Sequence, residues 1–356
     1  METPTIEDAA ADSSALDARP LLEVRNLKTH FFLDQGIVRA VDGVDFSVAR
    51  GQTIGLVGES GCGKSVTARS ILRIVPAPGK VEGEILLHRY SDSNGSQTHE
   101  VLDLTKMDHR GRQIRQIRGG EISMVFQEPM TSLSPVHTIG NQIMETILLH
   151  QPVTKEEARA QAIDVLDQVG MPLPERTIDR YPHELSGGMR QRAMIAMALS
   201  CRPSLLIADE PTTALDVTTQ AQILTLMRRL QDELGMAIIF ITHDLGVIAQ
   251  MVDYVIVMYL GQVVETADVD TIFYAPKHPY TQALLRSIPR LGERSTKGSA
   301  DRLAAIRGSV PDPYSIPKGC AFHPRCHKAI AGVCDQKEPP FLELEGGQKV
   351  RCVLYE

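Results

Sequence analysis

The chain has 356 residues, of which 43% are hydrophobic and 23% charged, an ordinary balance for a globular protein that excludes disordered, collagen-like and coiled-coil chains. Its 37 Lys and Arg against 44 Asp and Glu give a net charge of −7, which disfavours nucleic-acid binding because that function usually needs a basic excess. No apolar run approaches the roughly 18 residues of a membrane span, and no secretory signal begins the chain, so we expect a cytosolic protein whose membrane role would come through partners.

The N-terminal part of the chain begins with an expected flexible acidic tail over residues 1–20. From Leu21 the pattern predicts short strands, LLEV, THFFL and GIVRAVDGVDFSV, joined by Gly and Asp turns. An apolar strand, TIGLVG, then ends at Gly58, and a helical segment, SVTARSILRIV, follows it. This strand, loop and helix form the first half of a βαβ unit.

The middle of the chain alternates strands and helices. Residues 121–127 (EISMVFQ) predict a buried strand, and residues 133–200 are largely helical, with a capping box at Thr154 and Glu157 and a helix stop at Gly170. SLLIADE and MAIIFITHD predict two buried parallel strands, separated by the helix QAQILTLMRRLQDEL. The order indicates an α/β core with a helical insert, followed by a polar linker at residues 290–302.

Residues 58–65 read GESGCGKS, the G-x-x-x-x-G-K-[ST] pattern, between a predicted strand and a predicted helix. Glycines allow backbone N–H groups to turn toward phosphate oxygens, and the helix N-terminus favours an anion. Lys64 can reach the β- and γ-phosphates, Ser65 can bind Mg²⁺, and Cys62 only supplies a small side chain. The predicted phosphate-binding residues are Gly58, Glu59, Ser60, Gly61, Cys62, Gly63, Lys64 and Ser65.

Two further motifs narrow the class of nucleotide-binding protein. LSGGMRQ (185–191) begins an apolar helix and predicts a second anion-binding helix N-terminus. LLIADE places Asp209 and Glu210 at the carboxyl end of a strand, where α/β sheets bind ligands. Asp209 could hold Mg²⁺ through water, and Glu210 is placed to polarise an attacking water. Taken alone, the Asp-Glu pair is also typical of a solvated strand end.

The motifs occur in one order: GESGCGKS, Gln127 after a strand, LSGGMRQ, LLIADE, ALD (214–216) and His243 in ITHD. This set resembles the ATPase subunits of ABC transporters over about residues 21–265. The resemblance implies an α/β fold, with an ABC-type P-loop ATPase core, an antiparallel β subdomain, a helical subdomain at about 133–200 and a small C-terminal extension. It also implies an ATP hydrolase.

The family's working unit is a head-to-tail pair of such subunits, which assigns roles to the matching residues. Each ATP lies between the phosphate loop of one subunit and the signature motif of the other, so Ser186, Gly187 and Gly188 would serve the partner's ATP. The resemblance also implies that Ser65, Gln127 and Asp209 bind Mg²⁺, and that Gln127 contacts Mg²⁺ or the lytic water. His243 would contact the γ-phosphate, and Asp216 would couple the two sites across the interface. Phe31 or Phe32 would stack on adenine.

The C-terminal segment, residues 266–356, carries HPYTQALL (278–285), I-x-G-x-V-P (306–311) and GCAFHPRC. It resembles the ATPase subunits of bacterial dipeptide and oligopeptide importers, the dipeptide type being favoured, and nickel importers share much of it. The resemblance implies a second, different ATPase subunit, two transmembrane permeases and an external peptide-binding protein, at the cytoplasmic face of the inner membrane. The alternatives are a soluble ATPase of the same core acting on ribosomes or DNA, and a subunit of an importer for nickel or another small solute.

Four of the six cysteines, Cys320, Cys326, Cys334 and Cys352, lie in the last 37 residues with the spacing C-x5-C-x7-C-x17-C. Zinc sites usually have paired C-x2–4-C knuckles, which are absent. Four thiolates can hold a [4Fe–4S] cluster, which is attributed to some members of the resembled family. We expect a structural cluster over about residues 320–352, and zinc, free thiols and a redox-sensing cluster remain alternatives.

Overall fold

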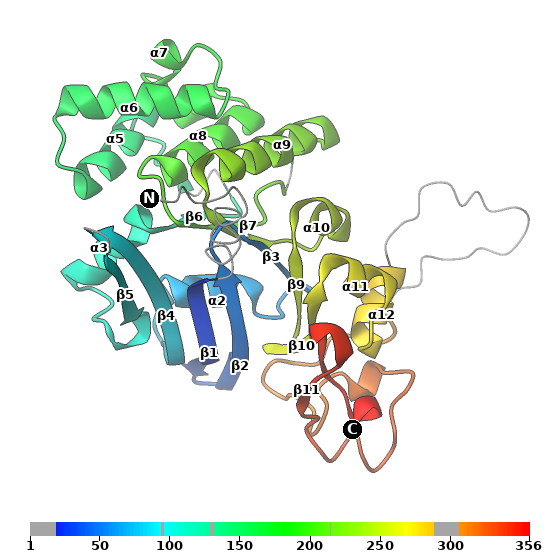
Figure 1. The fold of residues 1–356 in the computed structure, drawn as a ribbon. Helices are drawn as coiled ribbons and strands as arrows, with labels where there is room; N and C mark the ends of the chain where they lie inside the picture. Colours follow the sequence, from blue (N-terminus) through cyan, green and yellow to red (C-terminus); the bar gives the residue numbers. More distant parts are fainter. Residues whose placement is uncertain (1–18, 94–95, 129–131, 214, 288–305) are drawn as a thin grey trace, which may run out of the picture. The chain divides into compact units, whose positions relative to one another are not determined.

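A computed structural model describes residues 19–93, 96–128, 132–213, 215–287 and 306–356 (Figure 1). The expected linker at 290–302 and nearly all of the expected tail at 1–20 lie outside these residues. Within them, no helix is long and apolar enough to cross a membrane. The chain divides into two compact units: Met1–Glu23, Ser47–Thr53 and Leu86–Ile241 form the first, and Val24–Phe46, Ile54–Ile85 and Thr242–Glu356 form the second.

Three parallel strands form the centre of the first unit: β6 (Ile122–Val125), β7 (Leu205–Asp209) and β8 (Ala237–Ile241). Every residue in them is buried, as expected for parallel strands covered on both faces. Val125 lies opposite Ala208, and Asp209 lies opposite Ile241. The predicted buried strands are therefore confirmed, and their carboxyl ends lie at the same edge.

The helical insert is also confirmed. It contains α5 (Ile139–His150), α6 (Lys155–Gln168), α7 (Pro174–Thr177) and α8 (Gly187–Leu199), which lie together in Figure 1. Thr154 and Glu157 form the predicted capping box at the start of α6, and Gly170, with φ 69°, follows its end. The first unit also has α3 (Arg112–Gly120) and α9 (Val217–Leu234).

Four longer strands precede β6 in the chain, and of these only β2 matches a predicted strand segment, GIVRAVDGVDFSV, within one residue. They are β1 (Pro20–Leu33), β2 (Gly36–Ala49), β4 (Gly79–Ser93) and β5 (Ser96–Asp103), the last two forming an antiparallel pair that the sequence did not identify. LLEV and THFFL were predicted as separate strands, yet both belong to β1. Asn26 takes φ 45° inside β1 and its N–H donates to Asp45 Oδ1 at 2.8 Å, so the strand is distorted there without ending.

The second unit carries the phosphate loop and the C-terminal segment on one sheet. β3 (Thr53–Val57) runs parallel to β9 (Tyr254–Tyr259), and then β10 (Gln262–Asp268), β12 (Lys349–Arg351) and β11 (Phe341–Glu343) follow as antiparallel neighbours. The boundary expected at 265–266 falls inside β10. The remaining elements of the described residues are α2 (Lys64–Ile71), α10 (Leu245–Met251), α11 (Val269–Tyr274), α12 (Pro279–Arg286) and the 3-10 turns η1 (Leu104–Lys106), η2 (Pro182–Glu184), η3 (His323–Arg325), η4 (Glu345–Gly347) and η5 (Val353–Tyr355).

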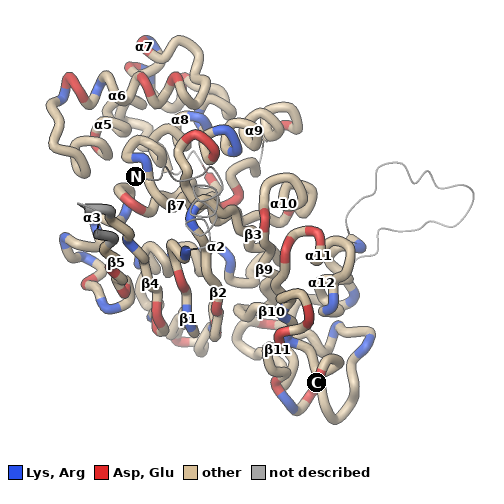
Figure 2. Tube along the Cα trace, viewed as in Figure 1, with Lys and Arg blue, Asp and Glu red and all other residues tan. Residues whose placement is uncertain are grey.

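A buried carboxylate joins the C-terminal segment to β10. Glu265 accepts hydrogen bonds from the N–H of Lys277 (2.6 Å), the N–H of His278 (3.0 Å) and Nε2 of Gln348 (2.8 Å). Burial lowers the pKa of His278 to about 3, so the imidazole is neutral and its Nδ1 accepts from the N–H of Tyr280 at 3.0 Å. These bonds fix the start of α12. Acidic and basic residues are interspersed along the C-terminal segment (Figure 2).

Candidate nucleotide site and C-terminal contacts

The phosphate loop joins the end of β3 at Val57 to the start of α2 at Lys64. Two of its glycines could not carry a side chain. A Cβ on Gly58 (φ 151°) would lie 2.3 Å from the carbonyl oxygen of Met258, and a Cβ on Gly63 (φ 106°) would lie 2.2 Å from that of Ala40. The loop therefore has the close backbone packing and left-handed conformations that only glycine permits.

Lys64 lies across this loop. Its side chain is buried, and Nζ donates to the carbonyl oxygens of Gly58 (2.8 Å) and Glu59 (3.1 Å). Ser65 follows it as the second residue of α2 and is half-buried. A lysine cation and a helix N-terminus at one glycine loop form an arrangement suited to a phosphate chain. Cys62 is buried beneath the loop and burial raises its pKa, which agrees with its interpretation as a small packing residue.

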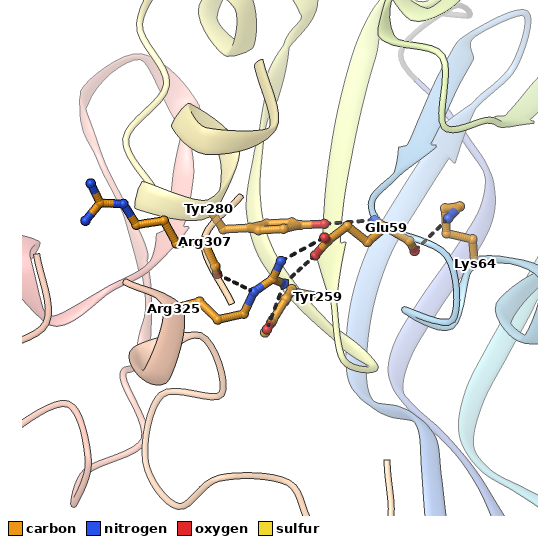
Figure 3. Close-up of polar contacts among 6 residues, drawn as sticks. All are labelled: Glu59, Lys64, Tyr259, Tyr280, Arg307 and Arg325. Atoms are coloured by element: carbon orange, nitrogen blue, oxygen red, sulfur yellow. Dashed lines mark hydrogen bonds and ion pairs between the residues drawn. The ribbon is translucent and has the colours of Figure 1, made fainter. Parts of the chain in front are cut away.

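Glu59 makes contacts that the sequence did not reveal (Figure 3). Arg325 Nη1 and Nη2 donate to Glu59 Oε2 and Oε1 at 2.6 and 3.0 Å, which forms a bidentate ion pair and raises the pKa of Arg325. The N–H of Glu59 donates to the hydroxyl of Tyr280 at 2.8 Å. Arg325 and Tyr280 belonged to recognised motifs, GCAFHPRC and HPYTQALL, but no pattern in either motif indicated a partner near residue 59.

The strand ends of the first unit bring Gln127 and Glu210 together, although they are 83 residues apart. Gln127 Nε2 donates to Glu210 Oε2 at 3.0 Å, and Thr213 Oγ1 donates to the same oxygen at 2.8 Å. Glu210 has φ 48°, and its N–H donates to the carbonyl of Ile241 at 2.8 Å. Asp209, just before it, is buried at the end of β7. The sequence did not identify the contribution of Thr213.

The signature motif begins α8. Ser186 is the N-cap and its hydroxyl accepts from the N–H of Met189 at 3.3 Å. Ser186 and Gly187 are exposed, whereas a Cβ on Gly188 would lie 2.9 Å from Cγ2 of Thr219. Thr219 in turn donates through N–H and Oγ1 to Asp216, the N-cap of α9, at 2.9 and 2.7 Å. These bonds lower the pKa of Asp216 and keep it ionised.

The remaining predicted residues lie in the second unit. Phe31 is half-buried on β1 beside Gly79, and Phe32 is 43% exposed with Lys80 Nζ 4.9 Å from the centre of its ring. His243 is exposed between β8 and Asp244, which caps α10. The adenine contact of Phe31 or Phe32 and the γ-phosphate contact of His243, like the other assigned roles, stay predictions.

The four C-terminal cysteines lie around one small cavity, which Cys320, Cys326, Cys334 and Cys352 line together with His278 and His323. Its volume is about 10 Å³, room for about one water molecule and too little for a cluster of four irons and four sulfides. Throughout the part of the chain that the structure describes, no group of three or more His, Cys, Asp or Glu side chains is placed to hold a metal ion. As placed, the thiols therefore form no metal-ligand set, and the predicted iron–sulfur cluster stays a prediction.

Comparison with known proteins explains the order of motifs. The family model "ABC transporter" matches residues 41–213, and "Oligopeptide/dipeptide transporter, C-terminal region" matches residues 264–334. The chain is 52% identical over 336 residues to the oligopeptide transport ATP-binding protein AppD of Bacillus subtilis, covering 94% of this chain and 97% of the relative. The chain belongs to the ATP-binding proteins of oligopeptide and dipeptide ABC transporters.

Other relatives agree with this assignment. The dipeptide transport ATP-binding protein DppD of Escherichia coli is 48% identical to this transporter ATPase over 332 residues, with 93% and 96% of the two chains covered. The dimeric ATP-binding cassette MJ0796, solved in a post-hydrolysis state with ADP and Pi, aligns with a TM-score of 0.59 at 26% identity and covers 70% of this chain and 98% of that one. The predicted fold class is confirmed, and the chain is an ATP hydrolase of the ABC type that binds ATP with Mg²⁺.

Proposed function

We propose that this ATPase hydrolyses ATP to power the import of dipeptides or oligopeptides across the cytoplasmic membrane. The observation that carries the proposal is similarity over nearly the whole of both chains to proteins named for peptide transport. It includes the C-terminal segment, of which residues 264–334 match the family model for the C-terminal region of oligopeptide and dipeptide transporters. Relatives named for dipeptide and for oligopeptide transport both match closely, so we favour the dipeptide type only on the basis of the sequence resemblance.

For binding, we propose that the phosphate loop, Gly58 to Ser65, holds the triphosphate, with Lys64 supplying positive charge. Ser65, Gln127 and Asp209 offer hydroxyl, amide and carboxylate oxygens, the donor chemistry that Mg²⁺ prefers, and Mg²⁺ would neutralise phosphate charge. Phe31, with Phe32 as the alternative, would stack on adenine. Support comes from the buried Lys64 and the glycine-only geometry of the loop.

For catalysis, we propose that Glu210 accepts a proton from the attacking water and that Gln127 orients this carboxylate and the water. Hydrogen bonds from Gln127 and Thr213 to one carboxylate oxygen fix the orientation of the base, which matters because positioning accounts for most of the catalysis of phosphoryl transfer. His243 would contact the γ-phosphate.

For assembly, we propose a head-to-tail pairing with a second, different ATPase, in which the exposed Ser186 and Gly187, with Gly188, contact the partner's ATP. Asp216 would couple the two sites, and its hydrogen bonds to Thr219 beside Gly188 support that role. The functional regions would be the ATPase domain at 21–265, its helical subdomain at about 133–200, and the C-terminal region at 266–356. Two permeases and an extracytoplasmic peptide-binding protein would complete the complex at the inner face of the membrane.

The proposal predicts what a tagged chain retains after gentle solubilisation of membranes. We expect two permeases, a second ATPase and a peptide-binding protein, because the transport unit must join ATP hydrolysis to a pore and a substrate receptor. Mass spectrometry of the purified complex is the measurement. Recovery with ribosomes or DNA-binding proteins would reject transport and favour the soluble alternative, and a homodimer of this chain would reject only the different-partner proposal.

We also propose that the four cysteines act as one site, with an iron–sulfur cluster as its occupant. Four thiols between residues 320 and 352 line one cavity, which supports a shared site, and the cavity would have to widen to admit the cluster. The protein purified anaerobically should be coloured and contain about four irons and four sulfides per chain. Cys201→Ser, outside the group, should keep the colour, whereas Cys334→Ser should lose it. Colourless wild-type protein without iron would reject the cluster, and zinc analysis of the same sample would separate the remaining alternatives.

A further inference from the structure

We infer that Arg325 and Tyr280, from the C-terminal segment, are positioning residues for the phosphate loop and set the affinity of the chain for ATP through Glu59. This inference rests on the proposed role of the loop in binding ATP. It assigns a function to contacts of Glu59 with residues 221 and 266 positions away in the sequence.

The ion pair between Arg325 and Glu59 is largely removed from water. The side chain of Arg325 is 4% exposed and that of Glu59 is 24% exposed. Arg325 also donates through Nε to the carbonyl of Arg307 at 3.1 Å and through Nη1 to the hydroxyl of Tyr259 at 3.4 Å, and its guanidinium lies 6.0 Å from the ring centre of Phe322. These contacts hold the guanidinium in one orientation, and Figure 3 shows the hydrogen bonds among them. A surface arginine would not provide such a fixed partner.

Glu59 is held at three points. Its carboxylate binds Arg325, its N–H donates to Tyr280, and its carbonyl accepts from Lys64 at 3.1 Å. A glycine-rich loop fixed in this way loses less conformational freedom when a ligand binds, which raises affinity. The pair also has an electrostatic effect. The Glu59 carboxylate places negative charge in the loop proposed to bind a polyphosphate, and the guanidinium offsets that charge.

The C-terminal segment is built to present both residues. Arg325 ends η3, whose first residue, His323, donates its N–H to the carbonyl of Cys320 at 2.9 Å. The N–H of Cys320 donates to the carbonyl of Cys334 at 2.8 Å. Tyr280 is completely buried in the first turn of α12, which the contacts of Glu265 and His278 fix. The cysteine-bearing segment therefore reaches the phosphate loop through Arg325.

The test measures ATP affinity and steady-state kinetics in the purified transporter complex for wild type, Arg325→Gln, Glu59→Gln, the double variant and Arg325→Lys. If Arg325→Gln leaves the loop competent about one-tenth of the time, the Kd and KM for ATP rise about tenfold. We expect kcat at saturating ATP to change less than about twofold. Arg325→Lys should recover part of the affinity, because it restores charge without the bidentate geometry. The double variant should bind ATP more tightly than Arg325→Gln, because it no longer has an unpaired carboxylate.

Arg286→Gln is the matched control. Arg286 and Arg325 both line a second cavity of the C-terminal segment, apart from the cysteine-lined one, but Arg286 is exposed. It should bind ATP like wild type. If Arg325→Gln does not fold, Tyr280→Phe is the variant that tests the inference. It removes only the hydroxyl that accepts a hydrogen bond from the N–H of Glu59, and it should raise the Kd for ATP about threefold. The inference would be overturned if Arg325→Gln bound ATP with wild-type affinity, or if Tyr280→Phe did so when Arg325→Gln does not fold. It would also be overturned if the double variant bound ATP no more tightly than Arg325→Gln. Failure of wild type itself to bind ATP would instead overturn the proposed function.

Discussion

Replacing Lys64 with alanine is expected to weaken ATP binding about a hundredfold and to abolish measurable hydrolysis. The ammonium is buried over the phosphate loop, where its attraction for phosphate is less screened than at the surface. Loss of one partner from a desolvated charge pair costs about 2–5 kcal/mol, and about 2.7 kcal/mol corresponds to a hundredfold in affinity. Equilibrium binding of Mg-ATP and the ATPase rate of the purified complex measure the effect.

The matched control for this variant is Lys155→Ala, which removes an exposed lysine from the first turn of α6. It should retain wild-type affinity. Lys64→Ala also removes the ammonium donor from the carbonyls of Gly58 and Glu59, so thermal unfolding must accompany the binding measurement. A folded Lys64→Ala protein that binds ATP within about twofold of wild type would exclude this loop as the main phosphate site.

Glu210→Gln is expected to slow hydrolysis about 100- to 10,000-fold while ATP binding persists, the usual range for loss of a general base. The amide keeps the shape of the carboxylate and can still accept from Gln127 and Thr213, but it cannot take a proton from water. We therefore expect the variant to accumulate as an ATP-bound closed dimer. Single-turnover hydrolysis and size-exclusion chromatography with Mg-ATP measure the two effects.

Glu156→Gln provides the control for charge removal, because Glu156 is an exposed acid in the first turn of α6. It should hydrolyse ATP at the wild-type rate and should not accumulate as a dimer. Thr213→Val tests the support of the base separately. It should lower kcat by a smaller factor than Glu210→Gln, because Gln127 still donates to the carboxylate. Full turnover by Glu210→Gln would remove Glu210 from its catalytic role.

Local sequence patterns were sufficient for much of the α/β core. Strands such as LLIAD and AIIFI are continuously apolar because both of their faces are buried, so they could be recognised without their neighbours. The capping box at Thr154 depends on residues three positions apart, and the phosphate loop depends on eight consecutive residues. The family resemblance then indicated Gln127, the signature motif and His243, which single short patterns could not assign.

The amino-acid sequence by itself determined the class of ATPase, the phosphate loop and the acids that follow β7, because each depends on neighbouring residues or on motifs in a fixed order. Only the tertiary structure decided that Asn26 distorts β1 without ending it, that Thr213 supports Glu210, and that Arg325 and Tyr280 hold Glu59. The last contacts join chain positions more than 200 residues apart. Their partners are set by strand pairing and by the burial of charge within the second unit, and neither leaves a periodic signal in the sequence.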